Sequence, residues 1–214
     1  MIRVGKNASA PQSLSTTKAY DGDDVKRQLK EDHNGKCYLC ERVLHTDCTV
    51  EHHKSQENFP HLKHDWRNLF WACSYCNGRK SDLFDSVLDP SQINIEVEIR
   101  QELDSIHKRV EFIATAEPTE EHIQTIELLN KLHNGKGKIR NFKEQEFFNY
   151  IHSKINDFLE LVVNYLKEPT PHNESQVRAQ LQIDRECLGF KYWIIKSNPF
   201  LERTFKNDII WNKI

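Results

Sequence analysis

The chain has 214 residues, of which 37% are hydrophobic and 29% are charged, and its formal net charge is −2. This composition is typical of one ordinary globular domain or two small ones, and no apolar run is long enough to cross a bilayer. The N-terminal segment MIRVGKNASAPQ lacks the apolar core of a signal peptide, so we expect a cytoplasmic protein whose six cysteines are metal ligands or buried thiols.

The charge balance argues against a strongly basic nucleic-acid binder. Residues 1–90 contain 13 Lys and Arg against 13 Asp and Glu, and residues 91–214 contain 17 against 19. A protein that binds nucleic acid alone usually has a surplus of positive charge to neutralise phosphates. If this chain binds DNA or RNA, either its positive charge is clustered locally or a partner supplies part of the affinity.

The first predicted elements are short. After the loop APQSLSTT, the segment DGDDVKRQLKEDHNG predicts a helix, because its aspartates suit a helix N-terminus and Asn34-Gly35 ends it. Residues 36–80 break the helical pattern, since TVEHH is short and β-branched and turn formers follow it. The segment SYCNGRKSDL predicts another short helix.

Beyond Pro90 the pattern becomes helical. EIRQELDSIHKRVEFIA and TEEHIQTIELLNKLHNG both place apolar residues three and four apart, and the second starts from Pro118-Thr119 and ends at Gly135. EQEFFNYIHSKINDFLELVVNYLKE predicts a long amphipathic helix, and ESQVRAQLQIDRECLGFKYWIIK predicts one more.

Two Cys-x2-Cys pairs frame the middle of the N-terminal half: Cys37/Cys40 and Cys73/Cys76. Each tight turn can present two thiolates to one tetrahedral Zn²⁺, and two such turns fill its coordination sphere. Since no position is left for water, this zinc would be structural rather than catalytic. The alternative is four unrelated buried thiols. The remaining cysteines have no paired spacing and are interpreted as small buried apolar residues: Cys48 and Cys187.

The residues between and after these pairs complete a recognisable combination. Type, order and spacing together resemble the cysteine-framed HNH endonuclease family over about residues 36–82, although no single residue is specific. The matching residues are Cys37, Cys40, Glu51, His52, Asn68, Leu69, Cys73, Cys76, Asn77 and Lys80.

The resemblance implies a ββα-metal fold, in which a β-hairpin carries the Glu-His pair and the following helix carries the last ligand. Glu51 and Asn77 offer oxygen ligands that suit a catalytic Mg²⁺ or Mn²⁺. His52 is the candidate general base that activates water for attack on a phosphodiester.

The other positions of the family pattern imply supporting roles. Asn68 would brace the hairpin loop through backbone hydrogen bonds, and Lys80 or Arg79 would contact a phosphate. The sequence departs from the pattern directly after the Glu-His pair, where the family commonly has an apolar residue and then a proline. A shifted register, with His52 as the ligand and His53 as the base, therefore stays open.

Other aromatic residues and histidines are given no chemistry. The aromatic residues near Asn68 are interpreted as core first and as a base-stacking platform only second: Trp66, Phe70 and Trp71. Histidines without a matched position are interpreted as loop or surface residues: His45, His61 and His64. The later histidines are interpreted as members of solvated helix faces: His107, His122, His133 and His152.

A narrower resemblance extends past the module. CYLCERVL, VEHHKSQ, WRNLFWACSYCNGRKSD and TIELLNKLHNGKGKIR are similar to the HNH subunits, called PtuB, of Septu and retron-associated anti-phage systems. This resemblance implies a nucleic-acid substrate, DNA before RNA, and an ATPase partner of the PtuA type, which would suit the missing basic surplus. Two alternatives stay open: a stand-alone HNH nuclease of a restriction or mobile-element system, and a zinc module that binds nucleic acid or protein without catalysis.

We therefore predict an α+β fold, mainly α, in three parts: an N-terminal loop and helix (1–35), an HNH ββα-metal module (36–90) and a helical region (91–214). The last part ends in the aromatic segment FKYWIIKSNPFLERTFKNDIIWNKI. Its large side chains are either interface anchors for the ATPase or part of the helical core: Trp193, Phe200, Phe205 and Trp211.

Overall fold

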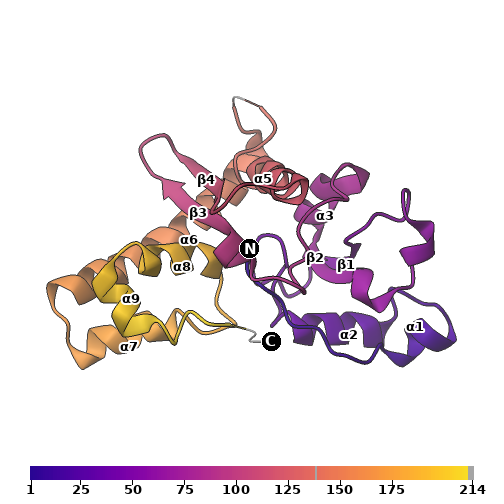
Figure 1. The fold of residues 1–214 in the computed structure, drawn as a ribbon, viewed down its shortest axis with the longest axis horizontal. Coiled ribbons are helices and arrows are strands. Elements are labelled where there is room, and N and C mark those ends of the chain that lie inside the picture. The colour runs from indigo at the N-terminus through magenta and orange to yellow at the C-terminus, as the bar shows by residue number, and fades with distance from the viewer. Residues whose placement is uncertain (138, 212–214) are drawn as a thin grey trace.

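The computed structural model describes residues 1–137 and 139–211 and is mainly helical, with two small antiparallel sheets. In Figure 1 the N-terminal elements lie on one side of the molecule, the C-terminal helices lie on the other, and a β-hairpin and one helix lie between them. The N-terminal elements are α1 (Gln12–Thr16), α2 (Asp23–Asp32), β1 (Cys48–His52), β2 (Leu69–Cys73) and α3 (Ser74–Lys80). The predicted class, α+β and mainly α, is confirmed.

Helix α2 follows the pattern predicted for it. Asp23 and Asp24 occupy its first turn, where the helix dipole favours negative charge. Its apolar face is fully buried through Val25 and Leu29, which pack in one core cluster with side chains of β1 and β2. The helix is followed by Gly35 at φ +73°, a left-handed conformation that suits glycine.

Strands β1 and β2 form an antiparallel hairpin that leads directly into α3. Glu51 faces Phe70 across the hairpin and His52 faces Leu69, at the end of β1. Every residue of β2 is buried, and the Cys73 thiol caps α3 by accepting a hydrogen bond from the Cys76 N–H. Helix α3 confirms the short helix predicted for the segment SYCNGRKSDL.

The segment EIRQELDSIHKRVEFIA is a β-hairpin, and the predicted helix is wrong. After the short helix α4 (Ile95–Glu98), strand β3 (Ile99–Asp104) pairs antiparallel with β4 (Arg109–Ala114). The buried residues alternate along both strands, because α8 packs on β3 and α5 packs on β4. The apolar residues fit both a period of two and a helical period, and this tertiary packing decides between them.

The remaining elements are helices: α5 (Glu120–His133), α6 (Phe142–Lys167), α7 (Pro171–Ala179), α8 (Leu188–Lys196) and α9 (Pro199–Phe205). The helices predicted at α5 and α6 are confirmed, and each begins with a capping box. The single helix predicted over residues 174–196 is wrong, because α7 and α8 are separate. Cys187, the residue before α8, has φ +57°, which no continuous helix contains.

Two aromatic residues of the C-terminal segment belong to the core. Phe205 is fully buried, and Trp211 is 6% exposed and donates a hydrogen bond from Nε1 to the Leu181 carbonyl oxygen at 2.7 Å. Phe200 is 38% exposed and stacks on Tyr165. Of the two interpretations, core packing therefore holds for Phe205 and Trp211, while residues 212–214 lie outside the described residues.

The two cysteine pairs and the later helices share one core. The largest core cluster contains the four paired cysteines together with Leu128 of α5, Phe147 of α6 and Phe190 of α8. Polar contacts add to this packing, since Glu186 accepts a hydrogen bond from the Val43 N–H at 2.7 Å. The hydrophobic packing is thus continuous across residue 90.

Candidate active site and metal centre

The four paired cysteines come together in a buried cluster. The Sγ atoms of Cys37, Cys40, Cys73 and Cys76 all lie within 4.8 Å of one another, and those of Cys40 and Cys73 are 3.9 Å apart. Tetrahedral zinc with bonds of about 2.3 Å would hold its sulfur ligands about 3.8 Å apart. The cluster therefore fits a metal such as zinc, and nothing in its geometry leaves a ligand position to water.

Burial and mutual hydrogen bonds set the protonation of the four clustered cysteines. Burial raises the pKa of the Cys37 and Cys76 thiols, so without a metal they stay neutral. Hydrogen bonds from the Cys37, Cys40 and Cys76 thiols lower the pKa of Cys73. A bound dication would stabilise all four groups as thiolates. Outside this cluster, Cys187 is buried and Cys48 is half-buried.

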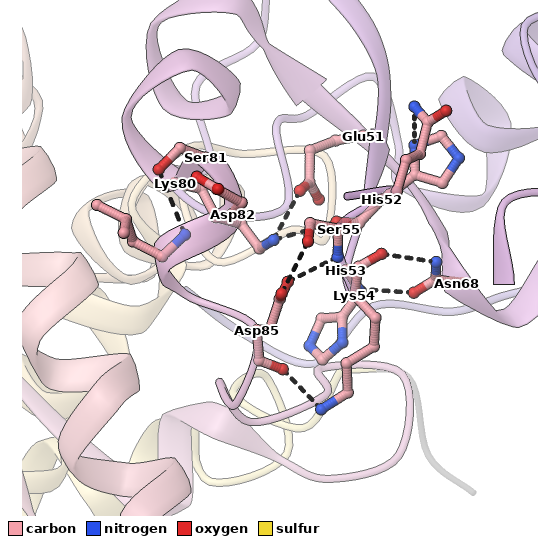
Figure 2. Close-up of polar contacts among 12 residues, drawn as sticks. Glu51, His52, His53, Lys54, Ser55, Asn68, Lys80, Ser81, Asp82 and Asp85 are labelled. Atoms are coloured by element: carbon pink, nitrogen blue, oxygen red, sulfur yellow. Dashed lines mark hydrogen bonds and ion pairs between the residues drawn. The ribbon is translucent and has the colours of Figure 1, made fainter. Parts of the chain in front are cut away.

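Glu51 lies at the end of β1 and points into the protein. Its side chain is 4% exposed, and its Oε1 atom lies 2.9 Å from Nζ of Lys80 (Figure 2). The Tyr38 hydroxyl donates a hydrogen bond to Oε2 at 2.6 Å. Both carboxylate oxygens are therefore engaged by groups of the chain itself.

Lys80 and Arg79, the two cations at the end of α3, have different surroundings. The Lys80 side chain is fully buried, and its ammonium also donates to the His52 carbonyl oxygen at 3.1 Å. Arg79 is 16% exposed, pairs with Glu144 at 3.4 Å and lies over the Tyr75 ring at 3.7 Å. In this conformation Lys80 holds Glu51 and does not face solvent.

His52 has a hydrogen-bond partner at each ring nitrogen. Nε2 lies 3.0 Å from the Lys63 carbonyl oxygen, and Nδ1 lies 3.2 Å from the Gln56 amide nitrogen. Because a carbonyl only accepts, this arrangement assigns the ring proton to Nε2 and the lone pair to Nδ1. Burial lowers the pKa of His52, which favours the neutral ring that can accept a proton.

His53 lies in a separate environment and points away from His52 (Figure 2). Its Nε2 atom is 3.4 Å from the Leu88 carbonyl oxygen, and its ring contacts Phe70. Burial lowers its pKa as well. A cavity of about 370 Å³ adjoins this ring and is also lined by Asp89.

The loop between β1 and β2 is held by two side chains. Asn68 accepts a hydrogen bond from the Lys54 N–H at 2.7 Å and donates to the Lys54 and Leu62 carbonyl oxygens at 2.9 and 3.2 Å. Asp85 accepts from the Ser55 N–H and hydroxyl at 2.6 and 2.8 Å (Figure 2). The sequence pattern indicates Asn68, whereas no local pattern distinguishes Asp85 or Tyr38 from other residues of their type.

The remaining residues considered in the sequence are placed as follows. Asn77 lies on α3 and is half-buried. The aromatic residues interpreted as core are buried: Trp66, Phe70 and Trp71. The assignment of His133 to a solvated helix face is wrong, since it is 2% exposed and packs against three phenylalanine rings. His107 lies in the turn between β3 and β4 rather than on a helix.

The fold and the site together define a mainly helical α+β protein in which four clustered cysteines frame a β-hairpin and a helix. No family model matches the chain. A segment of 69 residues, 31% of the chain, is 38% identical to the Septu protein PtuB of Bacillus thuringiensis and spans 26% of that protein's length. The chain is thus similar in part to a Septu protein. Among the described residues, no helix is long and apolar enough to span a membrane.

Proposed function

We propose that the chain is a metal-dependent HNH endonuclease that hydrolyses phosphodiester bonds in nucleic acid, DNA before RNA. The observation that carries this proposal is the protonation state assigned to His52. Its Nε2–H is held by the Lys63 carbonyl, so Nδ1 has the lone pair that a general base needs, and in this structure that lone pair accepts a hydrogen bond from the Gln56 amide. The partial similarity to PtuB supports a role in anti-phage defence, beside an ATPase subunit of the PtuA type.

Each residue of the site has a role in this proposal. His52 accepts a proton from the attacking water at Nδ1 after that water has replaced the Gln56 amide as its hydrogen-bond partner. Glu51 and Asn77 would provide the oxygen ligands of Mg²⁺ or Mn²⁺, an ion that stabilises negative charge on the phosphate when bound. The cysteine cluster with its zinc fixes the hairpin against α3. Asn68 and Asp85 hold the loop that contains the Lys63 carbonyl.

A local group of positive charges supports nucleic acid as the substrate. Residues 131–143 contain five lysines and arginines and no acidic residue, although residue 138 lies outside the described part of the structure. Lys136 and Lys143 are exposed. Burial lowers the pKa of Lys131, and the nearby charges of Lys136 and Arg79 lower it further, although Arg79 is itself paired with Glu144. A phosphate backbone would relieve this repulsion.

One observation favours a second candidate, a zinc module that binds nucleic acid or protein without catalysis. The Glu51 carboxylate is engaged at both oxygens by Lys80 and Tyr38, as a purely structural glutamate would be.

The test is incubation of the purified chain with plasmid, single-stranded DNA and RNA in Mg²⁺ or Mn²⁺, alone and with a PtuA-type ATPase. We expect cleavage by the wild type and by His45→Ala, an exposed control histidine, and a loss of at least ~10² in rate for His52→Ala. Equal cleavage by His52→Ala would contradict the proposed base. Binding without cleavage under all these conditions would favour the zinc module. Cleavage by a chain that shows no interaction with the ATPase would favour a stand-alone nuclease.

A further inference from the structure

The Lys80 ammonium occupies the position beside the Glu51 carboxylate where another cation could bind. The two side chains are 0% and 4% exposed, and Nζ lies 2.9 Å from Oε1. The second oxygen accepts a hydrogen bond from Tyr38 at 2.6 Å. The carboxylate is therefore neutralised by one internal positive charge, and each of its oxygens has a donor.

Both partners of Glu51 come from the segments that carry the clustered cysteines. Tyr38 follows Cys37 within the first Cys-x2-Cys pair. Lys80 lies four residues after Cys76 on α3, a spacing that places both side chains on the same helix face. Both groups that contact the Glu51 carboxylate are thus close in sequence to the clustered cysteines.

A divalent ion and the Lys80 ammonium compete for the same carboxylate. Mg²⁺ binds carboxylate oxygen at about 2.0–2.1 Å. An ion at Oε1 would therefore lie within a few ångströms of a second cation, in a buried place where water screens their repulsion little. In the conformation described here, Glu51 does not fit a divalent ion.

We propose that Lys80 is an internal counter-ion that keeps Glu51 in a metal-free resting state, and that a divalent ion binds only after the ammonium leaves this carboxylate. The proposal rests on the proposed function, in which Glu51 is a ligand of the catalytic ion. It gives Lys80 an autoinhibitory role in the free chain. Any partner or substrate that withdraws Lys80 would then activate the site.

The test measures Mn²⁺ affinity of the zinc-loaded full chain by electron paramagnetic resonance of the free ion. Lys80→Met removes the charge and keeps the length of the side chain, and we expect it to bind Mn²⁺ at least tenfold more tightly than the wild type. Glu51→Gln in the Lys80→Met background should abolish this gain. Lys30→Met removes an exposed charge in the last turn of α2, and it should leave the Mn²⁺ affinity within about twofold of the wild type. Equal affinities of wild type and Lys80→Met would overturn the proposal.

A second measurement needs no substitution and applies even where Lys80→Met fails to fold. Lys80 is fully buried, so an amine-acetylating reagent should modify it slowly in the free chain. Saturation of the wild type with Mn²⁺ should expose Lys80 and raise its labelling at least tenfold, as measured by mass spectrometry. A chain that is saturated with Mn²⁺ while Lys80 stays protected would refute the displacement.

These readouts separate this inference from the proposed nuclease activity. If Lys80→Met binds Mn²⁺ more tightly but neither it nor the wild type cleaves nucleic acid, the counter-ion role of Lys80 is supported and the proposed nuclease activity is contradicted. If the wild type cleaves nucleic acid while Lys80 stays protected from labelling at saturating Mn²⁺, the nuclease activity is supported and the counter-ion role of Lys80 is contradicted.

Discussion

The ring of His52 is fixed by the carbonyl oxygen of Lys63, which lies 3.0 Å from Nε2. The two residues are eleven positions apart, so the loop between β1 and β2 determines the orientation and the protonation state of the ring. This contact links the stability of the loop to the chemistry proposed for the site, and the first two predictions concern it.

The first prediction concerns the pH dependence of cleavage. Burial lowers the pKa of His52, so the neutral base persists below the ordinary histidine value of about 6.5. Activity should therefore be lost only as the pH falls below about 6.5. A pH–rate profile in Mn²⁺ measures this limb. A limb centred above 6.5 would show that the described environment does not govern the base.

The second prediction concerns the loop. Asn68→Ala removes three hydrogen bonds to backbone groups, which we expect to cost about 2–4 kcal/mol of stability and to lower cleavage further by releasing the Lys63 carbonyl. Urea unfolding measures the first effect. Asn7→Ala, on an exposed loop, is the matched control and should change stability by less than about 1 kcal/mol. Similar losses in both variants would argue against a special role of Asn68.

The third prediction concerns the metal. The purified chain should contain one tightly held zinc, with an apparent binding free energy of ~10–16 kcal/mol that is also folding free energy. Cys73→Ser should lose the zinc and the cooperative melting transition, whereas Cys48→Ser, outside the cluster, should keep both. Metal analysis and calorimetry provide the measurement. An unchanged melting curve after zinc removal would refute a structural metal.

The fourth prediction concerns acid stability. His133 is packed among three phenylalanine rings, and neither ring nitrogen has a hydrogen-bond partner within the described residues. Burial holds its pKa well below the ordinary value, so the folded chain binds this proton less readily than the unfolded chain. The stability due to this group is complete above about pH 6.5 and is lost as the pH falls below it, by up to about 1.4 kcal/mol per pH unit.

His133→Leu should therefore flatten the decline of unfolding free energy between about pH 6.5 and pH 5, relative to the wild type. His45→Leu, at an exposed position, should leave the decline unchanged. Urea titrations at several pH values measure it. A parallel decline in His133→Leu and wild type would mean that His133 does not contribute.

The fifth prediction concerns the C-terminal aromatic residues. Phe205→Ala should cost about 3–5 kcal/mol of unfolding free energy, because this side chain is fully buried. Phe200→Ala, at 38% exposure, should cost about 1 kcal/mol. Urea unfolding of both variants checks the order. A larger loss of unfolding free energy in Phe200→Ala than in Phe205→Ala would contradict the core role of Phe205 and favour the interpretation of this segment as an interface.

Local sequence predicted the parts of the fold that depend on neighbours in the chain. The cysteine pairs and the start of α5 follow from short-range spacing, and the hairpin–helix order follows from the family resemblance. Local sequence does not predict the β3–β4 hairpin, because its apolar residues fit two periods and the covering helices are distant in sequence.

The candidate site was predictable to the level of residue type and order. Glu51, His52 and Asn68 were identified in the sequence, and the structure brings Glu51 to Lys80 and Asn68 to the loop. The burial of Lys80 was not predictable, because a lysine near the end of a helix is ordinarily exposed. Only the three-dimensional arrangement of Tyr38 and Lys80 around Glu51 explains it.

The core cluster that contains the paired cysteines also contains side chains from helices beyond residue 90. Since the four cysteines pack in the same cluster as Leu128, Phe147 and Phe190, removal of the metal would loosen the contacts of α5, α6 and α8 as well as the hairpin. We therefore expect a chelator to lower the stability of these helices as well as that of the hairpin. The excised segment 36–90 would expose apolar surface that these helices normally cover. We therefore expect the hairpin and its cysteines to fold poorly when they are separated from these helices.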